Sequence, residues 1–145
     1  MDMKSAVAGE ITSLLKKHFE IRKLWMYDQF NQVYEKNILM QGIDLEDRFI
    51  DFLTSEGVQE ILFFPEPGFD TENVGARILT TEEVSDFICK HAAIWTNNHI
   101  ASPDLAWIFT LSHVGDYLLS GPVGFAKKAL DFLKEAGAKK KSAVD

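Results

Sequence analysis

Cys89, His91 and His99 are the residues whose types suggest a metal site, because thiolate and imidazole are common zinc ligands in proteins. Zinc-binding motifs usually contain two closely spaced pairs of ligands, and no second pair accompanies these three residues. His91 also falls on the apolar stripe of a predicted helix, where a histidine that contributes to packing is the simpler interpretation. The sequence therefore predicts no metal site.

His113 and Asp116 flank a predicted turn, and a carboxylate beside an imidazole can orient a general base. Trp107 and Tyr117, on the segments that flank this turn, can supply the aromatic walls of a pocket. However, turns favour polar residues for conformational reasons alone, and no nucleophile elbow or phosphate-binding loop is present. The sequence predicts no catalytic residue and no cofactor, and it retains this four-residue pocket as an alternative.

Charge is concentrated in the middle of the chain. Residues 44–86 carry twelve acidic and two basic side chains, a net charge of −10, whereas residues 1–43 and 87–145 have net charges of +1 and +2. Such a field repels phosphate backbones, so direct nucleic-acid binding is not expected. The region is interpreted either as a solvated surface that promotes solubility or as a face for a basic protein partner.

If the acidic region is a binding face, four of its residues are the candidates for contact. Asp47 and Asp51 lie on the outer side of a predicted helix, and Glu72 lies in the loop that follows a predicted strand. Phe69 lies in the same loop, beside prolines and a glycine, and is predicted to be an exposed aromatic anchor.

Helical signals occur in four stretches. Residues 5–37 carry an apolar stripe at helical spacing, which predicts one long helix or two helices with a break near residues 22–25. Asp44 is predicted to be the N-cap of a helix over residues 45–55. A capping box at Thr80 and Glu83 and a Gly-Pro pair at residues 121–122 start the other two helices.

Strand signals also occur in four stretches, at residues 58–64, 76–79, 105–111 and 116–120. The last two alternate around His113-Val114-Gly115 and are predicted to form an antiparallel hairpin, followed by the C-terminal helix. The sequence thus predicts an α+β fold, with an antiparallel sheet of about four strands packed against about four helices.

Residues 1–138 are predicted to form a single domain, and residues 139–145 to form a polar, flexible tail. No apolar run is long enough to cross a bilayer, and the single cysteine favours a reducing cytoplasm. The leading interpretation is a non-enzymatic acidic protein that neutralises or scaffolds a basic protein partner. The alternatives are a ligand-binding or enzymatic domain with an aromatic pocket near residues 105–120, and a self-associating structural subunit such as a homodimer.

Overall fold

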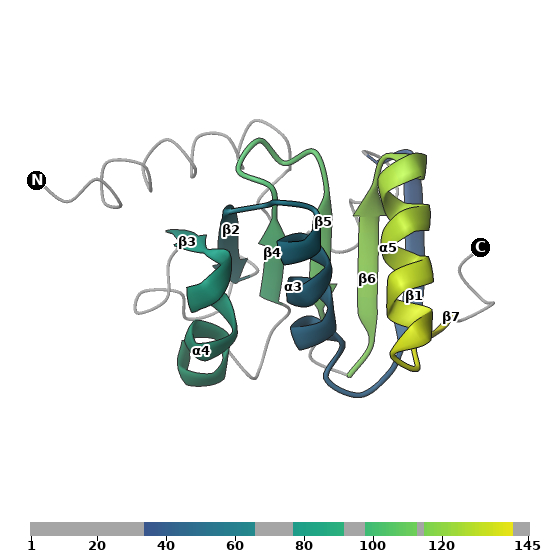
Figure 1. Ribbon diagram of the computed structural model, residues 1–145, viewed down its shortest axis with the longest axis horizontal. Coiled ribbons are helices and arrows are strands. Elements are labelled where there is room, and N and C mark those ends of the chain that lie inside the picture. Colours follow the sequence, from purple (N-terminus) through teal and green to yellow (C-terminus); the bar gives the residue numbers. More distant parts are fainter. Residues whose placement is uncertain (1–33, 66–76, 92–97, 113–114, 141–145) are drawn as a thin grey trace, which may run out of the picture.

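The computed structural model describes residues 34–65, 77–91, 98–112 and 115–140 (Figure 1). Within these residues, seven strands form one antiparallel sheet, and three helices pack against it. The fold therefore mixes helices with a sheet as predicted, but the predicted count of about four strands and about four helices is wrong.

The sheet has the strand order β3-β2-β4-β5-β6-β1-β7. Its strands are β1 (Lys36–Gln41), β2 (Glu60–Pro65), β3 (Arg77–Thr80), β4 (Asn98–Ala101), β5 (Ile108–Leu111), β6 (Tyr117–Gly121) and β7 (Lys139–Lys140). The helices are α3 (Leu45–Ser55), α4 (Thr81–His91) and α5 (Val123–Glu135), and all three lie on the same face of the sheet (Figure 1).

Three of the seven strands were not predicted. β1 begins inside the stretch assigned to the N-terminal helix, β4 lies in a stretch for which no strand was predicted, and β7 lies in the predicted tail. β1 and β4 are paired on both sides, β1 with β6 and β7, and β4 with β2 and β5. Their inner residues are buried on both faces, so these strands lack the alternation of apolar and polar residues that identifies a strand in sequence.

The predicted hairpin is confirmed. β5 and β6 pair antiparallel, with Phe109 opposite Leu119, and the backbone N–H of Ser112 donates to the carbonyl of Asp116 at 2.9 Å to continue the ladder toward the turn. Gly115 has φ of +90°, a conformation that glycine adopts without the steric cost of a side chain.

The start of α4 confirms the predicted capping box. The backbone N–H of Thr80 donates to Glu83 Oε1 at 3.1 Å, and the backbone N–H of Glu83 donates to Thr80 Oγ1 at 3.3 Å. The predicted bounds of α3 are also confirmed, and Asp44 does occupy its N-cap position, but the expected side-chain hydrogen bond is absent. Asp44 has φ of 53° and its side chain caps no backbone N–H, because the left-handed backbone does not have the extended geometry of a side-chain cap.

The largest part of the core lies between the sheet and the three helices, on what we call the helix face. Phe49 of α3 is fully buried there and stacks on Phe109 of β5, with ring centroids 4.2 Å apart. Trp107 meets the edge of the Phe49 ring at 5.3 Å and stacks on Phe125 of α5 at 5.1 Å. Burying each of these side chains contributes about 1.5–3 kcal/mol, so this cluster is a main source of stability.

The other side of the sheet, which we call the opposite face, mixes apolar and polar buried residues. His99 Nδ1 and Thr110 Oγ1 share a hydrogen bond of 2.8 Å between β4 and β5, and Ser120 Oγ donates to Asn37 Oδ1 at 2.7 Å between β6 and β1. The apolar residues that surround these pairs are Leu39, Leu62, Phe64, Ala101, Ile108 and Leu118.

Candidate functional site

Two of the four predicted contact residues lie in the described part of the chain. Asp47 and Asp51 are both exposed on α3, one helical turn apart. Asp51 accepts a hydrogen bond of 3.5 Å from Arg48, and both members of this ion pair are well exposed. Phe69 and Glu72 lie outside the described residues.

Three of the four residues of the alternative pocket lie in the described part of the chain. Trp107 is only 7% exposed and packs in the core, beside Gly121 at one end of β6, where a Cβ atom added to Gly121 would lie 2.9 Å from the Trp107 Cβ. Tyr117 begins the same strand at its other end, and Asp116 precedes it. His113 lies outside the described residues. Trp107 and Tyr117 therefore lie near opposite ends of β6.

A different feature stands out where β1 leads into α3, at residues 41–44, which we call the β1–α3 corner. Ile43 is 86% exposed, the most exposed large apolar side chain of the described residues. Gly42 precedes it and passes so close to the buried Leu45 that an added Cβ atom would lie 2.7 Å from the Leu45 side chain. Asp44 follows in a left-handed conformation, which aspartate tolerates better than most residues other than glycine. Ile43 therefore lies between a glycine that passes close to Leu45 and an aspartate in a left-handed conformation.

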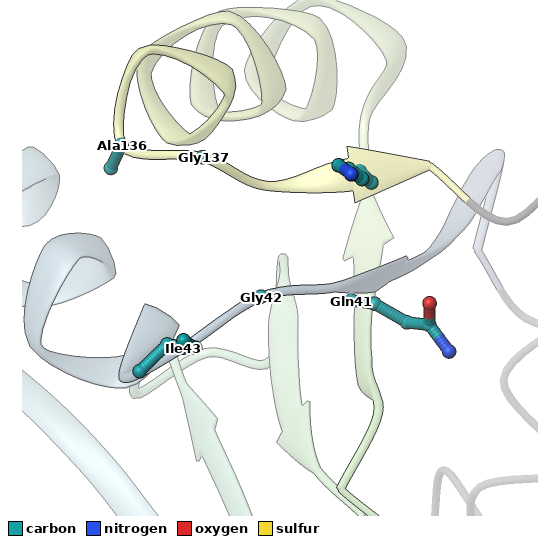
Figure 2. A pocket seen from close by; sticks show the side chains of 6 residues that line it. Gln41, Gly42, Ile43, Ala136 and Gly137 are labelled. Atoms are coloured by element: carbon teal, nitrogen blue, oxygen red, sulfur yellow. The ribbon is translucent and has the colours of Figure 1, made fainter.

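An open pocket of about 410 Å³ lies beside the corner (Figure 2). The last residue pair between β1 and β7 is Gln41 with Lys139. Beyond this pair the two backbone segments separate, one leading to α3 and the other to the end of α5. The separation opens a hollow whose sides are mostly apolar or backbone. Its lining residues are Gln41, Gly42, Ile43, Ala136, Gly137 and Lys139.

Tyr117 ties the first turn of α3 to the sheet next to the corner. Its hydroxyl donates to Glu46 Oε2 at 2.5 Å, and its ring stacks on Phe109 with centroids 5.5 Å apart. Burial, followed by the hydrogen bond to Glu46 and the negative charge of that carboxylate, raises the pKa of Tyr117 well above its usual value. The phenol therefore stays neutral and keeps donating to Glu46, which anchors the corner to β6.

The surface of the helix layer is electrically polarised. Residues 44–60, which include α3, carry six acidic side chains and one basic one, whereas residues 123–140, which include α5 and β7, carry five basic and two acidic ones. Lys128 Nζ and Glu56 Oε1 join the two halves at 2.7 Å. The exposed acidic residues of α3, α4 and their flanks are Asp44, Asp47, Asp51, Glu56, Glu60, Glu82, Glu83 and Asp86.

Sequence reasoning overlooked Ile43, although it identified the acidic stretch that begins beside it. A single apolar residue between a glycine and an aspartate carries no periodic signal, and isolated exposed apolar residues are common. Only the structure shows that Ile43 is exposed and that Gly42 beside it passes close to Leu45.

Within the described residues, no three His, Cys, Asp or Glu side chains are grouped so that they could hold a metal ion. In the same part of the chain, no helix has both the length and the apolar character needed to cross a membrane. Comparison with family models, with curated proteins and with solved structures finds no match to this chain.

Proposed function

We propose that this chain is a non-enzymatic binding protein that neutralises or scaffolds a basic protein partner in a reducing cytoplasm. The observation that carries the proposal is the β1–α3 corner, where Ile43 is 86% exposed next to the acidic surface of α3. A charged surface alone needs no partner. The exposed side chain of Ile43 beside that surface supplies the apolar contact that charge does not.

The two features have different roles in the proposed complex. The net charge of residues 44–60 attracts a basic partner over a distance set by the Debye length, about 8 Å at physiological salt, and so raises the association rate. Ile43 inserts into an apolar recess of the partner and slows dissociation. Phe69 and Glu72 stay predicted contacts, because they lie outside the described residues.

The test separates the two roles by measuring binding kinetics to the protein that the chain captures from its native extract. Asp47→Lys combined with Asp51→Lys should lower the association rate and weaken its dependence on salt, with little change in dissociation. Ile43→Ser should raise the dissociation rate about tenfold or more, equivalent to at least about 1.4 kcal/mol. Since both sites are exposed, unfolding free energies should change by less than about 0.5 kcal/mol.

Val123→Ser is the matched control, because Val123 is also an exposed aliphatic residue, at 46%, but lies at the start of α5. It should leave both rates unchanged. The proposal is wrong if the captured protein binds the Ile43 and Asp47/Asp51 variants with wild-type rates.

A further inference from the structure

The hollow beside the β1–α3 corner and the exposed side chain of Ile43 belong to one patch of surface, which we call the corner patch (residues 41–47 and 134–140). Ile43 is 86% exposed and lies on one side of the hollow, and Ala136 lies on the other side (Figure 2). The hollow measures about 410 Å³, within the size range of pockets that hold small molecules, so it has room for one aliphatic side chain. A projecting apolar group and a recess that can receive such a group therefore lie next to each other.

Charges of opposite sign flank the hollow. Residues 41–47, on the α3 side, carry three acidic side chains and no basic one, whereas residues 134–140, on the side of α5 and β7, carry three basic side chains and one acidic one. Asp44 follows Ile43 directly, Lys139 lines the hollow, and both side chains are exposed. The corner patch thus contains an acidic half and a basic half in addition to its projection and its recess.

We infer that two copies of this chain associate through the corner patch as a two-fold symmetric dimer, with Ile43 of each copy in the hollow of the other copy. A two-fold axis brings the same patch of both copies together, so each group must find its complement within that patch. In the corner patch Ile43 faces the hollow, and Asp44 faces Lys139. A small molecule bound in the hollow would leave Ile43 in water, whereas a second copy buries the projection and fills the recess at once.

The extent of the corner patch sets the strength of the dimer. A stable interface buries about 800 Å² on each partner, and the corner patch covers only one corner of the sheet and the end of α5. The dimer is therefore weak and reversible, with a dissociation constant above about 1 μM. Its charged pairs lie at the surface, so salt weakens the association further.

The dimer also regulates the site of the proposed basic partner, and this part of the inference rests on the proposed function. Ile43 is the anchor proposed for that partner, and one side chain cannot occupy the partner and a second copy together. The partner therefore binds the monomer, and a high concentration of the chain should slow its binding.

Sedimentation of the purified full chain between about 1 μM and about 1 mM tests the dimer. The wild type should change from monomer to dimer over this range. Ile43→Ser removes the projection and Ala136→Gln blocks the hollow, so each should raise the dissociation constant at least about tenfold. Both positions are exposed, so both variants should unfold at the wild-type urea midpoint, and Val123→Ser should associate like the wild type. A chain that stays monomeric throughout, or an Ile43→Ser variant that associates like the wild type, would overturn the inference.

Mixing the two variants tests the symmetry of the contact. In a mixed dimer the Ile43→Ser copy still has an open hollow and the Ala136→Gln copy still has its Ile43, so one of the two contacts is restored. The mixture should therefore associate more tightly than either variant alone. A mixture that associates no better than the separate variants would contradict the two-fold arrangement.

The charged pair has its own test. Asp44→Asn keeps a residue that tolerates the left-handed backbone, and Lys139→Gln keeps a long side chain, so each removes charge alone. Each should raise the dissociation constant about three- to tenfold, and the double variant should raise it no further than the larger single effect. Additive effects would contradict the pairing of Asp44 with Lys139.

These measurements use the chain alone, so they are separate from the test of the proposed function. A monomeric chain whose Ile43→Ser variant still dissociates faster from the captured protein would refute the dimer and leave the proposed function standing. A dimer that depends on Ile43, with partner rates that do not, would support the dimer and refute the proposed function.

Discussion

The two faces of the sheet are formed by the same strands but bury different kinds of side chains. The helix face is almost wholly apolar and is organised around Phe49, which contacts Trp107, Phe109 and Phe125. The opposite face buries hydrogen-bonded polar pairs among its apolar residues, including His99 with Thr110.

The difference indicates that one face mainly supplies stability and that the other mainly fixes the register of the strands. Apolar burial is strong but non-directional, so the helix face supplies much of the driving force for folding without selecting one strand alignment in detail. A buried polar group is costly when it loses its partner, so a slipped strand would be penalised on the opposite face. The comparison predicts that truncating side chains on the helix face lowers the free energy of unfolding the most. Removing a single hydrogen bond on the opposite face should lower it less.

The largest effect is expected for Phe49→Ala. Removing this ring leaves a cavity between α3 and the sheet and should lower the free energy of unfolding by about 3–5 kcal/mol in urea denaturation. Asp51→Ala, on the exposed side of the same helix, should change it by less than about 0.5 kcal/mol. A loss below about 1 kcal/mol for Phe49→Ala would show that the helix face is not the main stabilising layer.

A smaller effect is expected for Thr110→Val, which keeps the shape of the side chain and removes the hydroxyl that bonds His99 Nδ1. The buried imidazole nitrogen then loses this partner, and unfolding free energy should fall by about 1–3 kcal/mol. Thr54→Val is the control, since Thr54 is exposed on α3 and its hydroxyl bonds only the preceding turn. If Thr110→Val costs no more than Thr54→Val, the polar pair does not contribute to stability.

The smallest effect concerns the margin of the helix face and appears only at high pH. In the folded chain, burial and then Glu46 raise the pKa of Tyr117. In the unfolded chain, the pKa of the same phenol is about 10. Its contribution to stability is therefore fully present below pH of about 10 and is lost as the pH rises above it. Stability measured between about pH 9 and 11 should fall less steeply in Tyr117→Phe than in the wild type.

Tyr34 behaves in the same sense, because burial and the charge of Asp104 raise its pKa. Tyr34→Phe should also flatten the alkaline decrease, and the double variant should flatten it further. Identical pH profiles for the wild type and both single variants would contradict the assigned pKa directions.

The candidate site could be predicted only in part. The exposure of Asp47 and Asp51 follows from the periodicity of α3, since Phe49 and Phe52 define its buried side. The constrained corner at Ile43 could not be predicted, because its geometry depends on contact between Gly42 and the buried Leu45. The sequence offered Trp107 as a wall of the alternative pocket, whereas the structure places it in the core. Aromatic residues are found in both environments, so the residue type alone does not distinguish them.

Local chemistry in the sequence by itself determined α3, the capping box at Thr80 and Glu83, and the hairpin around Gly115. Each depends on residues within a few positions of one another, through helical periodicity, reciprocal capping and a backbone conformation that favours glycine. Tertiary structure alone decided that β1 and β4 are strands inside a seven-stranded sheet. Their partners are distant in sequence, and burial on both faces removes the alternation that would have identified them, so only the assembled sheet reveals them.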